Sequence, residues 1–120
     1  MKIIEEKERP EKATLIVDAY KVDEVVFPSG DKAKKLFLHG KIPEVDAETD
    51  ISATDTGALW VKNEATTENI VVGSRSNTSI FLKVFKIKKE KDLVGKKYPL
   101  IQKPSKADPN RKFYVINTSA

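Results

Sequence analysis

The sequence predicts a mostly β fold, a small antiparallel barrel of five to seven strands with at most one or two short helical turns. Val and Ile together number 21 against 7 Leu, and β-branched side chains suit a pleated strand better than a helix. Apolar and polar residues alternate in several short segments that turn residues separate. A closed or partly open barrel would bury the apolar faces and leave few free sheet edges.

A long hairpin opens the predicted barrel. Residues 1–12 are highly charged, and we expect them to be a mobile lead-in to a single domain at 13–120. Residues 13–27 read as one strand, which is so long that it must bend or carry a bulge. A turn at 28–32, with Pro28 and Gly30, then leads into a second strand at 35–42.

The signals that follow the hairpin are weaker. Residues 43–57 are acidic and rich in turn residues, which predicts an acidic loop. Residues 59–61 predict a short strand, whereas residues 63–73 fit a short helix and a strand equally well. A turn is predicted at 73–77.

The segment 79–89, SIFLKVFKIKK, fits either a helical stripe or a strand by its spacing. Its composition favours a strand, because it has one Leu and no Ala or Glu. In a strand, Phe81, Lys83 and Phe85 would share one face, and rings that stack on bases beside a lysine suit single-stranded nucleic acid. The alternative is that both phenylalanines belong to the core and Lys83 extends past them to solvent.

Three further elements complete the chain. Residues 88–95 contain a predicted helical turn that Gly95 ends. A short strand at 97–101 contains Pro99, which predicts a sheet edge or a strand end. A basic loop at 102–111 and a last strand at 112–117 follow.

Charge is divided unevenly along the chain. Residues 1–70 carry 10 Lys and Arg against 15 Asp and Glu, whereas residues 71–120 carry 12 against 3. The excess of Lys and Arg in the second half predicts an electropositive surface on part of the fold, and such a surface is typical of proteins that bind polyanions.

Few residues are suited to catalysis. The chain has no cysteine and one histidine, His39, so we predict no enzyme activity, no cofactor and no metal site. The alternative is a hydrolase that uses carboxylates and a metal ion, which would require tight binding of Mg²⁺ or Mn²⁺. Asp46, Glu48 and Asp50 alternate as in a calcium loop, but the central glycine and the closing glutamate are missing. With no cysteine and no long apolar segment, we expect a cytoplasmic protein that makes no contact with a membrane.

The order of these elements resembles that of small OB-fold proteins, including phage and archaeal single-stranded DNA-binding proteins. The resemblance rests on residues 12–41, where a long first strand turns into a second, and on DLVGKKYPL at 92–100. It implies a groove across the first strands, flanked by loops, that takes a single strand. Tyr20, Lys35 and Phe37 lie in the matching hairpin, and Lys83 and Phe85 come from a later strand. The acidic residues 43–57 depart from this pattern, because they would repel phosphate beside such a groove.

We therefore predict a non-catalytic protein that binds single-stranded nucleic acid, with DNA as the first candidate, through a basic and aromatic β surface. The candidate binding residues are Tyr20, Lys35, Phe37, Trp60, Arg75, Lys83, Phe85, Lys86 and Lys88. The alternative function is a protein-interaction or assembly module, as in a virion or complex subunit, with the same apolar strands as its interface. A protein partner at the acidic loop 43–57 and a homo-oligomer are further hypotheses.

Overall fold

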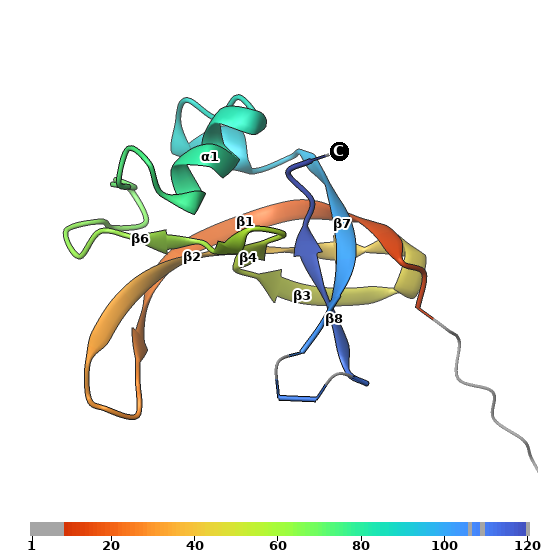
Figure 1. Cartoon of the computed structure of the whole chain (residues 1–120). Helices are drawn as coiled ribbons and strands as arrows, with labels where there is room; N and C mark the ends of the chain where they lie inside the picture. The colour runs from red at the N-terminus through yellow and green to blue at the C-terminus, as the bar shows by residue number, and fades with distance from the viewer. Residues whose placement is uncertain (1–8, 106, 109, 120) are drawn as a thin grey trace, which may run out of the picture.

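The computed structural model describes residues 9–105, 107–108 and 110–119, and within them the fold is mostly β (Figure 1). One α-helix, α1 (Asn77–Val84), and two 3-10 turns, η1 (Pro43–Val45) and η2 (Glu90–Leu93), lie between the strands. The strands are β1 (Lys12–Val26), β2 (Lys32–Ile42), β3 (Ala47–Ile51), β4 (Ala53–Thr54), β5 (Gly57–Ala58), β6 (Trp60–Val61), β7 (Lys97–Pro104) and β8 (Lys112–Ile116). Of the predicted lead-in, residues 1–8 lie outside the described residues, and Lys12 already pairs with Ile101.

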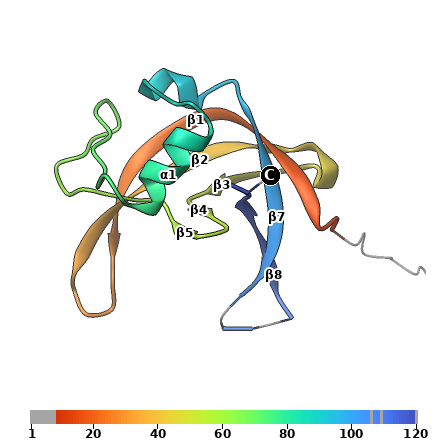
Figure 2. The same cartoon turned by 45° about the horizontal axis from the view of Figure 1, so that its top comes forward.

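The strands form one strongly curved sheet in the order β3-β2-β1-β7-β8-β4-β5, with β6 also paired to β2 (Figures 1 and 2). A single residue, Ser52, separates β3 from β4, so residues 47–54 pair with β2 at their start and with β8 at their end. The β4–β8 pair, Thr54 opposite Ile116, is parallel, whereas the other pairs in the described residues are antiparallel. In the described residues, β3, β5 and β6 each pair with one strand alone, so a closed barrel is not confirmed. The same residues form eight strands, where five to seven were expected.

The long first hairpin is confirmed. β1 and β2 pair from Ile16 opposite Lys41 to Val26 opposite Lys32. The register shifts between Val17 and Ala19, inside the long strand that is expected from the sequence to bend or carry a bulge. Gly40 lies opposite this bulge, and a side chain there would overlap the carbonyl oxygen of Ile16. The two strands therefore approach closely where β1 bends.

The core lies between the inner face of the curved sheet and the layer made by α1 and η2 (Figure 2). Phe81 of α1 is fully buried and its ring lies 5.7 Å from that of Tyr98 in β7, whose hydroxyl donates to the carbonyl of Leu93. The buried cluster consists of Ala13, Leu15, Val17, Leu36, Leu38, Ile42, Ile51, Leu59, Phe81, Leu93, Tyr98, Leu100 and Ile116.

The strand predicted at 79–89 is wrong, because residues 77–84 form α1. The hydroxyl of Ser76 accepts a hydrogen bond from the backbone N–H of Ser79, so the predicted turn at 73–77 ends in a helix cap. Burial of Thr78 and Phe81, with Phe85 half-buried beside them, follows a helical spacing of three and four residues. Packing of this stripe outweighs the strand preference of the β-branched residues, which is worth less than about 1 kcal/mol per residue.

The acidic loop predicted at 43–57 is also wrong, because this range contains η1, β3, β4 and β5. Its acidic residues alternate with residues that face the sheet interior, and Ile51 opposite Leu38 is buried. Residues 63–73, expected to be helix or strand, form neither. They are turns held by backbone hydrogen bonds such as Lys62 N–H to the carbonyl of Val71.

The strand at 97–101 is confirmed within β7, but β7 lies inside the sheet between β1 and β8. The carbonyl of Pro99 accepts from Asn117, one residue past the end of β8. Because the N–H and C=O of a strand residue point to the same side, the missing donor of Pro99 faces that strand end. The helical turn before Gly95 is confirmed as η2, and the last strand is confirmed as β8.

Candidate nucleic-acid interface

A concave surface, called here the groove, runs across β2, β3 and β8. It consists of two adjoining pockets that share Arg9 and Phe113. Lys35 lies at one end, residues 47–53 form its floor, and Arg111 and Lys112 lie at the other end. The tip of the β1–β2 hairpin and the adjoining ends of β7 and β8 both project from the side of the sheet opposite α1 (Figures 1 and 2).

Cations and aromatic rings gather where the hairpin meets the groove, in a set called here the hairpin patch: Lys21, Phe27, Lys35, Phe37 and Trp60. The Nζ of Lys35 lies 4.8 Å from the ring centroid of Trp60 and 5.9 Å from that of Phe37. The Nζ of Lys21 lies 5.5 Å from the Phe37 ring, and the rings of Phe27 and Trp60 are 5.6 Å apart. These distances are typical of cation–π and aromatic contacts.

Strand register explains why the hairpin patch forms. Lys21 pairs with Phe37, and Lys35 pairs with Trp60 of β6, so these side chains stand on one face of the sheet. The intervening residues Leu36 and Leu38 point into the core. Trp60 is 36% exposed, and Phe113, where the two pockets of the groove adjoin, is 45% exposed. Large rings with this much free surface can stack on bases.

A histidine cluster occupies the same face of β2, two residues beyond Phe37. The Nδ1 of His39 lies 2.8 Å from Asp50 Oδ1, and its Nε2 lies 3.0 Å from Glu48 Oε1 and 4.0 Å from Asp18 Oδ1. Register places Asp50 opposite His39, and the β1 bulge carries Asp18. Hydrogen bonds to Glu48 and then to Asp50 raise the pKa of His39 above its ordinary value. Because Glu48 and Asp50 also line the groove, its floor carries negative charge in the pocket that contains Lys35.

Of the sequence-predicted site residues, the structure brings together Lys35, Phe37 and Trp60. Tyr20 lies on the opposite face of the hairpin, because it pairs with the buried Leu38. Partial burial, followed by the charges of Glu90 and Glu68, raises the pKa of Tyr20. Its ring packs against the core and belongs to the side of the sheet that α1 and η2 cover.

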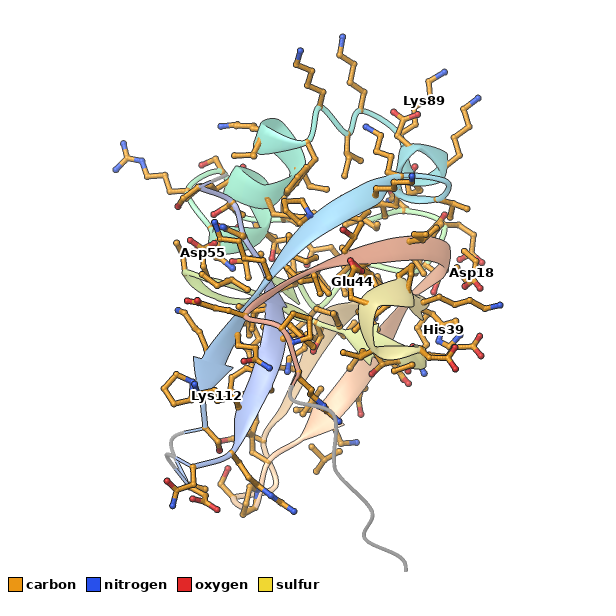
Figure 3. All side chains as sticks on the ribbon, turned by 90° about the vertical axis from the view of Figure 1, so that its right-hand side faces the viewer. Asp18, His39, Glu44, Asp55, Lys89 and Lys112 are labelled. Carbon is orange, nitrogen blue, oxygen red and sulfur yellow. The ribbon has the colours of Figure 1, made fainter. Side chains whose placement is uncertain are left out.

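The remaining predicted cations lie on the α1 side of the molecule. Arg75 precedes the helix, Lys83 lies in it, and Lys86 and Lys88 follow it, all exposed. In Figure 3, Lys89 of the same segment lies at the opposite end of the molecule from Lys112 of the groove. These cations therefore form a second basic surface, separate from the groove.

Phe85 belongs to the core. Its ring lies 5.3 Å from that of Phe81 and 5.0 Å from that of Tyr98. The shared strand face proposed for Phe81, Lys83 and Phe85 is wrong, because these residues lie in and just after α1. The interpretation that both phenylalanines are core residues is confirmed.

Sequence reasoning missed six cations and aromatic residues of the groove and the hairpin patch: Arg9, Lys21, Phe27, Arg111, Lys112 and Phe113. The alternation of Lys21 with apolar neighbours in β1, and the run Lys112–Tyr114 in the last strand, were the available signals. Their proximity to Lys35 depends on pairing between distant strands, which a single sequence does not display.

No protein-family model, curated protein or solved structure matches this chain. Neither the helix nor the 3-10 turns of the described residues are long and apolar enough to cross a membrane.

Proposed function

We propose that the protein binds single-stranded nucleic acid, without catalysis, in the groove and on the hairpin patch. The observation that carries this proposal is the position of Lys35, whose ammonium lies 4.8 Å from the centroid of the exposed Trp60 ring and 5.9 Å from that of Phe37. Bases that stack on such rings gain about 1–3 kcal/mol each, and the ammonium is placed for a neighbouring phosphate. Single strands expose both their bases and their phosphates, which fits this pairing of groups.

We further propose that the curved sheet is a partly open barrel of the OB type. In that fold, a groove on the second and third strands, with loops at its two ends, holds oligonucleotides. The support lies in topology: a long bulged β1 pairs with both β2 and β7, a helix precedes β7, and β8 runs parallel to β4. The groove lies across β2 and β3, where this fold binds its ligands.

The path of the phosphates is suggested by the cations of the groove. Arg111 and Lys112 lie at one end, Arg9 beside Phe113, and Lys35 at the other end. The α1-side cations, among them Lys83 and Lys88, are not part of this path. We therefore expect contacts to the groove cations to dominate the salt dependence of binding, with log K falling by about 0.7 per contact per log unit of salt.

The test compares two charge-reversal pairs that change the net charge equally. A fluorescein-labelled dT oligonucleotide is titrated with the protein at two salt concentrations, and anisotropy and Trp60 emission are both recorded. The groove pair, Lys35→Glu with Lys112→Glu, should weaken binding at least about tenfold and reduce the salt slope by about 1.4. The α1 pair, Lys83→Glu with Lys88→Glu, should leave the salt slope unchanged.

Quenching of Trp60 on binding would place a base beside its ring, and Trp60→Leu should then weaken binding about tenfold. Two results contradict the proposal. One is no binding of dT even at low salt. The other is a larger loss of affinity in the α1 pair than in the groove pair, which would move the nucleic-acid surface to the α1 side.

A further inference from the structure

The histidine cluster has the geometry of a metal site. Three ligand atoms, one each from Asp18, His39 and Glu48, lie within 4.8 Å of one another. Oxygen and nitrogen ligands about 2.0–2.2 Å from one ion stand about 3–4 Å apart, which matches the 3.0 and 4.0 Å distances from His39 Nε2. The three side chains come from β1, β2 and β3, so rigid strands hold them.

Asp50 would orient the histidine ligand of such a site. Its carboxylate lies 2.8 Å from Nδ1 of His39, on the side of the ring away from Asp18 and Glu48. A carboxylate that accepts the Nδ1 proton fixes the tautomer in which Nε2 carries the free electron pair. This pairing of carboxylate and imidazole commonly supports metal-ligating histidines. Nε2 is the atom that faces the other two carboxylates.

We propose that Asp18, His39 and Glu48 bind one divalent cation, with Asp50 orienting the imidazole. One nitrogen and carboxylate oxygens, with positions left for water, suit Mn²⁺ or Zn²⁺ better than Mg²⁺, which prefers oxygen alone. Asp18 and His39 lie side by side at the surface, where an ion has access from solvent (Figure 3).

The cation would also change what the groove can bind. Glu48 and Asp50 line the groove beside the cationic Lys35, so a phosphate backbone that follows β2 meets negative charge there. A bound dication offsets that charge, and its open positions can take phosphate oxygens. This effect of the cation on the groove rests on the proposed function, and it makes the affinity for nucleic acid depend on the cation.

Calorimetric titration with Mn²⁺ and with Zn²⁺, in the absence of nucleic acid, tests the site itself. We expect one ion per chain, with affinity at least about tenfold lower in His39→Gln and in Glu48→Gln. Asp46→Asn is the matched control, because it removes an exposed carboxylate two residues from Glu48 that does not belong to the cluster. No saturable binding, or equal affinity in His39→Gln and the unmodified protein, overturns the proposal.

The dT titration with and without Mn²⁺ tests the effect on the groove. Mn²⁺ should raise the affinity of the unmodified protein several-fold and leave that of His39→Gln unchanged. If Mn²⁺ binds but the affinity for dT does not change, the proposed contact between the bound cation and phosphate oxygens is wrong. A protein that binds Mn²⁺ as expected and never binds dT contradicts the proposed function and leaves the cation site standing.

Discussion

Gly40 determines how closely β1 and β2 approach at the bulge. A Cβ at this position would overlap the carbonyl oxygen of Ile16 and contact its carbonyl carbon, which are backbone atoms that cannot rotate away. Gly40→Ala must therefore push the two strands apart or shift the bulge that carries Asp18. We expect the free energy of unfolding to fall by about 2 kcal/mol or more, as in other overpacked sites.

Urea unfolding followed by Trp60 emission measures this loss, and Gly73→Ala is the matched control. A Cβ at Gly73 would make only an ordinary contact, 3.7 Å from Ser76, so the control should change stability by less than about 0.5 kcal/mol. Equal stability of the two variants would show that β1 and β2 can separate at Gly40 without cost.

At the residue scale, the sequence predicts neighbours within one strand better than neighbours across strands. Lys35 and Phe37 share a face because they are two apart in a strand that the pattern identifies. The same rule places His39 on that face, although it gives no sign that Asp50 stands opposite His39 or that Glu48 contacts it. That placement needs the β2–β3 register, which depends on a strand hidden in an acidic segment.

Lys86, which follows the C-terminal end of α1, has a strained backbone conformation. This residue has φ of 56°, in the left-handed region, and its N–H donates to the carbonyl of Lys83. The N–H of Ile87 donates to the carbonyl of Leu82, which completes a Schellman end with an apolar contact between half-buried residues. Glycine adopts this conformation without penalty, so Lys86→Gly should stabilise the protein by about 0.5–1 kcal/mol.

Lys83→Gly gives this prediction a control with the opposite sign. Lys83 lies inside α1 and is exposed, so glycine there should destabilise the protein by about 1 kcal/mol. In thermal unfolding, the midpoint of Lys86→Gly should lie above that of the unmodified protein, and the midpoint of Lys83→Gly should lie below it. A lower midpoint for Lys86→Gly than for the unmodified protein would contradict the assignment of strain to this residue.

At the element scale, composition alone predicts the wrong secondary structure for two segments whose structure depends on tertiary packing. Residues 79–89 have a strand-like composition, yet the cap at Ser76 and the burial of Phe81 make α1. Residues 43–57 look like a loop because their inner face holds mostly small residues, with Val45 partly buried and Ile51 buried. The first hairpin was predictable, since its apolar alternation continues through more than twenty residues around a clear turn.

At the scale of the whole molecule, the curved sheet depends on a contact between its middle and its C-terminal end. Thr54 pairs with Ile116, and the carboxylate of the next residue, Asp55, accepts hydrogen bonds from the N–H and hydroxyl of Thr118 and from the hydroxyl of Ser119. Lys103 Nζ donates to the Asp55 carbonyl from β7. No sequence pattern predicts the contact of Asp55 with Thr118 and Ser119, called here the clamp, because these residues are more than sixty positions from Asp55.

This clamp should make the free energy of unfolding decrease at acidic pH. Burial alone would raise the pKa of Asp55, but the hydrogen bonds from Thr118 and Ser119 outweigh it and lower the pKa below its ordinary value. A lowered pKa means that the folded state favours the carboxylate. The contribution is therefore complete above the unfolded pKa of about 3.9 and is lost as pH falls through the lower, folded value.

Asp55→Asn keeps the shape of the side chain and removes its charge, so it should cost about 1 kcal/mol at pH 7. Thermal unfolding between pH 7 and pH 3 should show the difference from the unmodified protein shrinking below about pH 4. Glu64→Gln, at an exposed position, controls for the loss of one negative charge. If the gap between Asp55→Asn and the unmodified protein stays constant down to pH 3, the ionised carboxylate does not hold the C-terminal end to the sheet.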